Sequence, residues 1–206
     1  MRTLARFASA LLVALALLSG ASAATGSAKA SIEGPVESVL SILRDPKYAK
    51  GAPALREEQF KKIREIIGGL FDYEEICARA AGKNWAGFTP AQKTAFTDAF
   101  TELLSNTYIR KIQSNFHSEK VVFLSEEALP NGRASVRTRV VREGGDVPVD
   151  YNLNVKGGNW RIYDIHVEGV SLIQNYRSQF SQILLKESPD QLIERIRKRN
   201  KEEPKQ

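Results

Sequence analysis

The sequence contains few of the residue types that build disulfides, metal centres or phosphate loops. It has one cysteine, Cys77, and two histidines, His117 and His166. A single cysteine cannot form an intramolecular disulfide, so the fold must be stabilised by packing. The histidines lie far apart in sequence, and neither belongs to a cluster of metal ligands with a recognised spacing. We therefore expect no metal site, and the lack of a glycine-rich phosphate loop predicts no nucleotide cofactor.

Long apolar runs are also missing. The longest one, Ala10–Leu18, is shorter than the roughly 20 residues that a membrane-spanning helix needs. It follows two arginines and precedes the small residues Ala21–Ala23, an arrangement typical of a cleavable signal peptide. We expect residues 1–23 to be removed and residues 24–206 to form a single domain. Such a protein is exported, most simply to the periplasm of a Gram-negative bacterium.

Neither sign of charge dominates the chain, which carries 30 basic and 24 acidic side chains. The two signs are interleaved except in "RIRKRNK" at 195–201. A basic segment of this kind can contact nucleic acid or anionic lipid. Cations also suit the C-terminal end of a helix, and this second interpretation is favoured because export separates the chain from nucleic acid. We expect no nucleic-acid partner.

Apolar residues spaced by three and four predict a series of helices. The clearest start is Thr89-Pro90-Ala91-Gln92, which has the cap, the proline and the third-position glutamine of a capping box. Ser188-Pro189-Asp190-Gln191 repeats this device. The small polar residues 24–31 are expected to form a mobile N-terminus. The predicted helices cover 35–43, 55–69, 70–82, 90–116, 171–186 and the chain after Ser188.

After Ser118 the apolar period changes from 3.6 to 2, which predicts strands over 120–129, 133–141, 147–155 and 160–167. The connections "PNG", "REGGD" and "KGGN" have the composition of hairpin turns, so the strands should form an antiparallel meander. Apolar and polar residues alternate in the third strand, which predicts a sheet with one apolar face and one solvent-facing polar face. The predicted fold is α+β, with a curved four-stranded antiparallel sheet covered on one face by helices.

Three residues invite an enzyme hypothesis: Asp164, His166 and Ser171 are the residue types of a hydrolytic triad. A nucleophile elbow has the pattern G-x-S-x-G, but here the stretch is "GVSLI", with Ile173 in place of the second glycine. Ser171 is better interpreted as the N-cap of the following helix. We expect a binding protein and not an enzyme, with an Asp164/His166 enzyme as the alternative.

Strand parity predicts where this segment points its side chains. Asp164 and His166 share one face of the last strand, and Tyr163, Ile165 and Val167 share the other. The apolar set should face the core, which leaves Asp164 and His166 on the wetter side. An exported domain with a broad apolar sheet face, aromatic helices and no catalytic constellation favours a binding protein.

Two long segments carry a family resemblance: "LFDYEEICARAAGKNWAGFTPAQKTAFTDAFTELLSNTYIRKI" and "WRIYDIHVEGVSLIQNYRSQF". They resemble the MlaC family of periplasmic ABC-transporter auxiliary proteins, also called toluene-tolerance proteins. The resemblance implies a cone-like fold similar to nuclear transport factor 2, enlarged by helices at both ends. It also implies a carrier that moves a diacyl phospholipid between an outer-membrane lipoprotein complex and an inner-membrane ABC transporter with a lipid-binding ring. Such a system maintains the lipid asymmetry of the outer membrane.

A lipid carrier needs an apolar pocket, and the predicted sheet face roofed by aromatic helices supplies candidates. A binding pocket and a packed core use the same residue types, so each candidate can equally be ordinary core. Two further alternatives remain open, a carrier of another lipid such as a hopanoid and a structural adaptor that uses the basic C-terminal helix. The candidate lipid-binding residues are Trp85, Phe96, Phe100, Leu104, Tyr108, Phe123, Val149, Tyr151, Leu153, Tyr163, Ile165, Val167, Val170, Ile173 and Tyr176.

Overall fold

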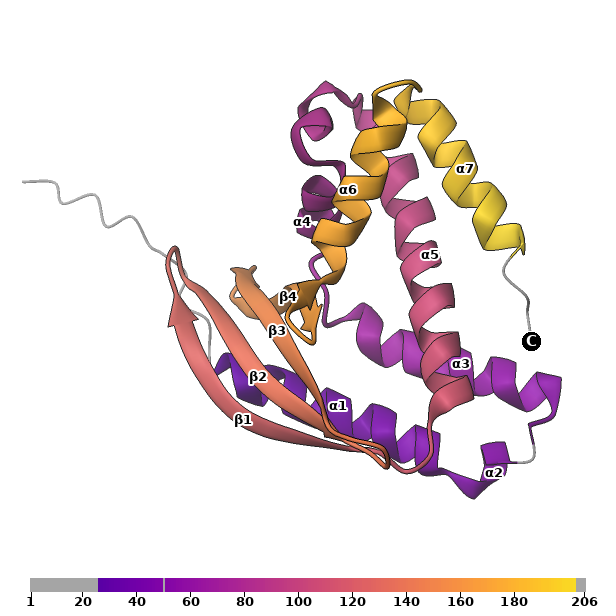
Figure 1. The fold of residues 1–206 in the computed structure, drawn as a ribbon, viewed down its shortest axis with the longest axis vertical. Helices are drawn as coiled ribbons and strands as arrows, with labels where there is room; N and C mark the ends of the chain where they lie inside the picture. Colours follow the sequence, from indigo (N-terminus) through magenta and orange to yellow (C-terminus); the bar gives the residue numbers. More distant parts are fainter. Residues whose placement is uncertain (1–25, 50, 203–206) are drawn as a thin grey trace, which may run out of the picture.

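A computed structural model describes residues 26–49 and 51–202 of the chain. The predicted signal peptide, residues 1–23, lies outside the described residues. Figure 1 shows a curved sheet on one side of the molecule and a group of helices on the other. Within the described residues, no helix is long and apolar enough to cross a membrane.

The order of elements confirms the predicted α+β fold and its antiparallel sheet. The strands lie in the order β1-β2-β3-β4-β5, so every strand neighbours the next one in sequence. The sheet has five strands where four were predicted, because two residues after the last predicted strand fold back to pair with it. The elements are α1 (Ala28–Arg44), α2 (Pro46–Ala49), α3 (Pro53–Gly68), α4 (Tyr73–Ala81), η1 (Gly82–Gly87), α5 (Pro90–Asn115), β1 (Lys120–Leu129), β2 (Arg133–Val141), β3 (Val147–Lys156), β4 (Asn159–Val167), β5 (Val170–Ser171), α6 (Leu172–Leu184) and α7 (Pro189–Glu202).

Polar caps fix where α5 and α7 begin. At the start of α5, the Thr89 hydroxyl accepts from the Gln92 N–H at 3.2 Å, and the Gln92 side chain accepts from the Thr89 N–H at 3.0 Å. Ser188 and Gln191 exchange the same pair of hydrogen bonds before α7. Each pair satisfies two N–H groups that a helix leaves without partners. Both predicted helix starts are confirmed.

Helix α1 begins at Ala28, so the prediction of a mobile segment over 24–31 is wrong for its last residues. Ser27 caps the helix, and a second acceptor comes from β1. The Glu126 carboxylate accepts from the N–H groups of Ala28 at 3.2 Å and Lys29 at 2.8 Å. A carboxylate stabilises a helix N-terminus through both hydrogen bonds and the helix dipole. This tertiary cap explains why the local sequence gives little sign of the helix start.

Helix α1 seals one end of the apolar face of the sheet. Cross-strand pairs place Ala134 beside Leu153, and Leu153 beside Ile162, at the end of the sheet near the β1–β2 and β3–β4 turns. The first half of α1 covers this end, where it packs along β1 and β2 (Figure 1). The buried residues of this cluster are Ala28, Ile32, Ala134, Val136, Leu153 and Ile162.

A β-bulge in β4 makes one prediction wrong, namely that Tyr163 faces the core together with Ile165 and Val167. Leu153 pairs with Ile162 and Asn152 pairs with Asp164, so Tyr163 is an extra residue without a partner on β3. The bulge puts Ile162, not Tyr163, on the apolar face together with Ile165. Tyr163 is instead buried beneath two cations, with the guanidinium groups of Arg79 and Arg133 at 4.2 Å and 5.1 Å from its ring centroid. Bulges change which face a side chain takes, because they interrupt the two-residue period.

The aromatic helix α5 does not roof the sheet. It packs mainly on α7, with further contacts to α3 and α4. Phe96 and Phe100 are fully buried there. The ring centroids of Phe100 and Tyr176 lie 4.9 Å apart in an edge-to-face contact. We call this cluster the helical core; its buried residues are Ile76, Cys77, Ala80, Ala81, Phe88, Phe96, Ala99, Phe100, Leu103, Ile173, Tyr176, Phe180, Leu192, Ile193 and Ile196.

Candidate functional site

The apolar face of the sheet is closed at one end only. At the opposite end, near the β2–β3 turn, its apolar side chains stay half-buried, apart from Val149 at 9 % exposure. Cross-strand pairing joins them into one continuous surface across the four long strands. We call this surface the open sheet end; it consists of Val121, Phe123, Val140, Val147, Val149, Tyr151, Ile165 and Val167.

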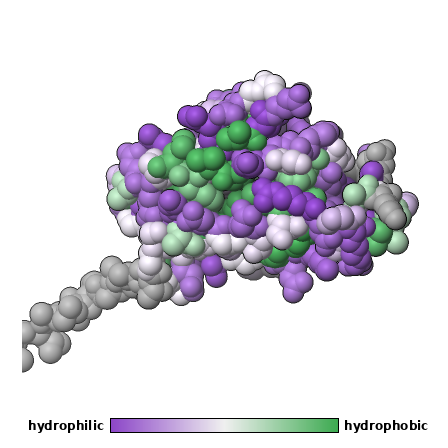
Figure 2. All heavy atoms as spheres, turned by 90° about the horizontal axis from the view of Figure 1, so that it is seen from below, coloured by the Kyte–Doolittle hydropathy of each residue, from purple (hydrophilic) through white to green (hydrophobic). Residues whose placement is uncertain are grey.

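The path of α1 explains why this end is left open. Its first half lies on the sheet, but Val39 and Leu43 in its second half pack instead against Phe60 of α3. The space-filling view from below shows a large group of apolar side chains, with smaller ones beside it, among hydrophilic side chains (Figure 2). Contiguous apolar surface that remains accessible in a folded chain marks a place for a ligand or a partner.

Tyr151 shows how enclosed the open sheet end is. Burial raises the pKa of the Tyr151 hydroxyl to about 12, although a hydrogen bond with Thr138 acts in the opposite direction. The side chain nevertheless keeps part of its surface accessible. Tyr151 is therefore largely surrounded by protein while part of its side chain stays accessible.

Helix α5 carries a second stretch of accessible apolar surface. Leu104 and Tyr108 are half-buried, and Ile112 is 45 % exposed. They are spaced by four residues, so they form one stripe along the helix. Figure 1 shows this half of α5 descending toward the start of β1, the strand that supplies Val121 and Phe123.

The predicted lipid-binding residues fall into three groups. Phe123, Val149, Tyr151, Ile165 and Val167 come together at the open sheet end. A second group belongs to the closed regions: Leu153 lies under α1, and the helical core contains Phe96, Phe100, Ile173 and Tyr176. Trp85, Leu104 and Tyr108 pack against the helical core but stay only partly buried. The third group lies elsewhere: Tyr163 is on the polar face of the sheet, and Val170 is 63 % exposed in β5.

Sequence reasoning missed Val121, Val140 and Val147, which belong to the same surface. The sequence does contain a signal for them. Strict alternation along the strands, combined with hairpin pairing, places these valines beside the predicted lipid-binding residues. Val140 lies directly opposite both Val121 and Val147. All three valines are half-buried, so they contribute accessible apolar surface to the open sheet end.

Asp164, His166 and Ser171 form a structural corner where β4 leads into α6. The Ser171 hydroxyl donates to Asp164 at 2.7 Å and accepts from the Gln174 N–H at 2.9 Å. The same carboxylate accepts from the backbone N–H groups of Ile165 at 2.8 Å and Ile173 at 3.3 Å. In a triad the histidine lies between the serine and the carboxylate. Here the serine bonds the carboxylate directly and caps α6, as predicted.

The polar face of the sheet also anchors α4. Asp72 accepts from the Lys156 ammonium at 2.8 Å and from the Asn154 amide at 2.9 Å, and it caps α4 through the Glu75 N–H at 3.2 Å. Burial acts to raise the pKa of Asp72, but the three hydrogen bonds and the Lys156 charge together hold it below its ordinary value. Asp72 is therefore ionised at neutral pH.

Cys77 lies in the helical core and is completely buried. Burial raises the pKa of its thiol to about 12, despite an opposing hydrogen bond with Thr97. The thiol stays protonated at neutral pH and is a poor nucleophile. Across residues 26–49 and 51–202, no three His, Cys, Asp or Glu side chains are placed to hold a metal ion.

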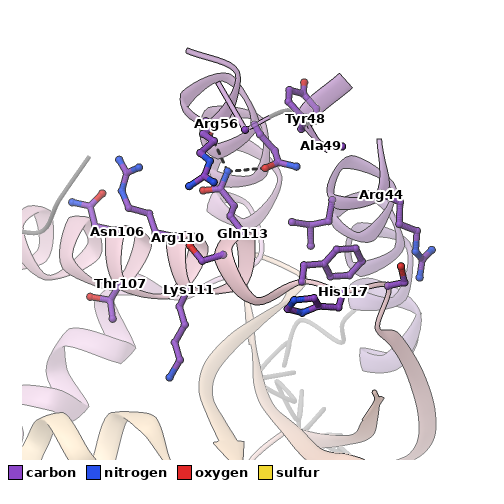
Figure 3. A pocket seen from close by; sticks show the side chains of 16 residues that line it. Arg44, Tyr48, Ala49, Arg56, Asn106, Thr107, Arg110, Lys111, Gln113 and His117 are labelled. Carbon is purple, nitrogen blue, oxygen red and sulfur yellow. Dashed lines mark hydrogen bonds between the residues drawn. The ribbon is translucent and has the colours of Figure 1, made fainter. Parts of the chain in front are cut away.

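A polar cavity of about 660 Å³ lies among α1, α2, α3 and the second half of α5 (Figure 3). None of the predicted lipid-binding residues lines it. Its lining is rich in cations and amides, among them Arg56, Arg110, Lys111, Gln113 and Asn106. These residues come from two helices that are far apart in sequence, so no local pattern marked them.

Comparisons with known proteins agree with one another. The family described as MlaC protein matches residues 34–198. The chain is 24 % identical over 160 residues to the intermembrane phospholipid transport system binding protein MlaC of Haemophilus influenzae, covering 75 % of this chain and 70 % of that protein. It is 24 % identical over 133 residues to the toluene tolerance protein ttg2D of Pseudomonas putida, covering 64 % of this chain and 61 % of that protein.

A solved structure extends the similarity to three dimensions. It is the phospholipid-binding protein from Ralstonia solanacearum in complex with a phospholipid. That chain is 26 % identical to this one and superimposes with a TM-score of 0.71. The match covers 85 % of this chain and 97 % of that one.

Proposed function

This chain belongs to the MlaC family, and on that premise we propose that it binds a phospholipid and carries it through the periplasm. The open sheet end is the observation that carries the proposal, because it offers accessible apolar surface inside an otherwise well-packed domain. We propose that the acyl chains lie against Val121, Val147, Tyr151 and Val167, with the other residues of this surface and the Leu104–Tyr108–Ile112 stripe as further walls.

The physical need for a carrier is large. A diacyl phospholipid that leaves a bilayer for water exposes roughly 30 methylene groups at about 0.8 kcal/mol each, on the order of 20 kcal/mol in all. Unassisted transfer is therefore very slow. A protein that covers the chains with apolar side chains removes most of this barrier.

The family also suggests the setting of the transport. The predicted signal peptide and the lack of a membrane-spanning helix in the described residues support export to the periplasm. We propose that the chain exchanges lipid with an outer-membrane lipoprotein complex and with an inner-membrane ABC transporter that has a lipid-binding ring. Such a system maintains the lipid asymmetry of the outer membrane, and the similarity to a toluene tolerance protein supports this role.

Native mass spectrometry of the protein purified from its source tests the proposal. We expect the mass of the chain plus one phospholipid, which organic extraction then releases and identifies. Recovery of a hopanoid would keep the carrier role and change the lipid class. A chain that is consistently empty, and that stays empty after incubation with phospholipid vesicles, would contradict the proposal.

A further inference from the structure

We propose that the end of the sheet covered by α1 is a floor that sets how long an acyl chain this protein accepts. The proposal rests on the phospholipid-binding function above and adds a limit on chain length to it. We call the buried cluster at this end the floor; it consists of Ala28 and Ile32 of α1 and of Ala134, Val136, Leu153 and Ile162 of the sheet.

Accessibility along the apolar face changes abruptly at the floor. On β3, Tyr151 keeps part of its surface accessible, whereas Leu153, the next residue on the same face, is completely buried. On β4, Ile165 is half-buried, and Ile162, which pairs with Leu153, is 2 % exposed. Tyr151 and Ile165 pack directly against the floor. An acyl chain that lies along the strands therefore finds accessible surface as far as these two residues and then meets the floor.

The length of the accessible surface fits an ordinary acyl chain. From Val147 to Tyr151, the apolar face of β3 spans four residue steps, or about 14 Å at the rise of an antiparallel strand. The hydrocarbon core of a bilayer is about 30 Å thick, so the chains of one leaflet occupy about 15 Å. A chain of ordinary membrane length therefore reaches from the outer margin of the open sheet end to the floor.

Tertiary hydrogen bonds hold α1 in place over the floor. The Glu126 carboxylate accepts from the N–H groups of Ala28 and Lys29, and the Trp160 indole N–H donates to the Gly26 carbonyl. These contacts fasten the start of α1 to β1 on one side and to β4 on the other. The helix is therefore fixed at the end where it closes the apolar face.

A second set of hydrogen bonds fixes β4 at the floor. The Ile162 N–H donates to the Leu70 carbonyl at 2.8 Å, and the Ile162 carbonyl accepts from the Asp72 N–H at 2.9 Å. The segment between α3 and α4 thus pairs with β4 in a parallel bridge, and Leu70 and Phe71 pack against the floor. A wall fastened by both its helix and its strands keeps its position when a chain presses on it.

A fixed floor converts excess chain length into a loss of affinity. Each methylene group that the protein cannot cover stays in contact with water and weakens binding roughly fourfold. The protein should therefore accept chains up to a limiting length and discriminate against longer ones. A groove that is open at both ends cannot provide this selection, because a longer chain simply extends beyond it.

The test compares the chain lengths of the lipids that are bound by the native chain and by three variants, all stripped of lipid. Each protein is equilibrated with vesicles that contain equal amounts of dimyristoleoyl, dipalmitoleoyl, dioleoyl, dieicosenoyl and dierucoyl phosphatidylcholine, whose chains lengthen by two carbons at each step. Native mass spectrometry then gives the proportion of each lipid bound. The cost of leaving the vesicle is the same for every protein, so differences between proteins report the site alone.

Two test variants change the depth of the site in opposite directions. Leu153→Ala deepens it by emptying part of the floor, and Ile165→Trp shortens it by placing a larger side chain on half-buried surface next to the floor. Leu192→Ala is the matched control for the first, because it truncates another completely buried leucine, in the helical core. Both leucine variants leave a buried cavity and should lose similar stability. Urea denaturation confirms that each variant folds.

We expect the native chain to bind the series up to a limiting length, and to bind the next longer lipid at least about tenfold more weakly. Leu153→Ala should move this limit by one step of the series toward longer chains. Ile165→Trp should move it toward shorter chains, and Leu192→Ala should keep the native limit.

A native chain that binds all five lipids in the proportions of the vesicle would overturn the floor while leaving the carrier function intact. An unchanged limit in Leu153→Ala, or an equal shift in Leu192→Ala, would overturn it as well. If Leu153→Ala does not fold, Ile165→Trp decides: a shorter limit supports the floor, and an unchanged limit overturns it. Failure of the native chain to bind any phospholipid is a different result, and it would overturn the proposed function too.

Discussion

The helical core and the open sheet end are built from similar side chains but differ in how completely those side chains are enclosed. In the helical core, Phe96 and Phe100 have no exposed surface, and each aromatic ring contacts several others. At the open sheet end, Val121, Val147 and Val167 lie on an equally apolar surface and stay half-buried. Composition alone does not distinguish an enclosed core from an open apolar surface, whereas the exposed fraction of each side chain does.

The difference has a physical basis. Three helices, α4, α6 and α7, and the 3₁₀ turn close around α5, and apolar and aromatic side chains fill the space between them. On the sheet, one helix must cover four long strands, and α1 turns away toward α3 before it reaches the far end. Stability is therefore expected to come mainly from the filled region, which leaves the other region free to accept a ligand.

The largest expected effect comes from breaking the helical core. Phe100→Ala should lower the free energy of unfolding by about 3–5 kcal/mol, because it leaves a cavity among Phe96, Tyr176 and Phe180. Ile112→Ala on the same helix, at 45 % exposure, should cost less than about 1 kcal/mol. Urea denaturation measures both, and a similar loss in the two variants would contradict the contrast between enclosed and open regions.

The β4–α6 corner, which connects the sheet to the helical core, should give the next largest effect on the free energy of unfolding. Asp164→Asn weakens three hydrogen bonds to a carboxylate at the β4–α6 corner, and we expect a loss of about 2 kcal/mol in unfolding free energy. Ser171→Ala removes the cap of α6 and one of the three hydrogen bonds to Asp164, and it should cost about 1 kcal/mol because the two backbone N–H groups still bond the carboxylate. Thermal melting ranks the stabilities of the two variants. A larger loss of stability for Ser171→Ala than for Asp164→Asn would argue against the Asp164 carboxylate as the main stabilising group of the β4–α6 corner.

A charge placed at the open sheet end should weaken lipid binding more than it weakens the fold. Val121→Lys puts an ammonium group on the proposed chain-binding surface, so we expect phospholipid uptake to fall about tenfold. Val122→Lys is the matched control. The Val122 side chain points to the face of the sheet opposite Val121, and it is already 43 % exposed. Vesicle uptake assays separate the two variants. Equal uptake by both would place the acyl chains elsewhere.

The smallest expected effect depends on pH. Because the folded-state pKa of Asp72 lies below its ordinary value near 4, its ionised form adds stability above that pH. This contribution is lost as the pH falls through the depressed folded-state pKa. At pH 7, Asp72→Asn should therefore be less stable than the native chain by about 1 kcal/mol. The difference should shrink below pH 4, and a constant difference from pH 7 to pH 2 in urea titrations would disprove this account.

Much of the fold is readable from the sequence because its signals are local. The capping boxes at Thr89 and Ser188 fix two helix starts, and the change of period after Ser118 locates the four long strands. The start of α1 is less readable, because one of its caps, Glu126, lies in a distant strand.

The features that could not be predicted from the sequence depend on how distant elements pair and pack. Tyr163, Ile165 and Val167 alternate perfectly, and only the pairing of β4 with β3 reveals the bulge that sends Tyr163 to the other face. Likewise, the apolar stripe of α5 is visible, but the sequence does not show whether it meets a sheet or other helices. Five of the predicted lipid-binding residues lie at the open sheet end because strand alternation places them there directly.

The two tryptophans give each region its own optical reporter. Trp85 packs edge-on against Phe96 at the margin of the helical core, while Trp160 lies beside the α1-covered sheet and donates from its indole N–H to the Gly26 carbonyl at 3.0 Å. Single-tryptophan chains, made by Trp85→Phe or Trp160→Phe, would each fluoresce from one region alone. Their emission can follow, in real time and without any label, whether the sheet side rearranges during lipid exchange while the helices stay still.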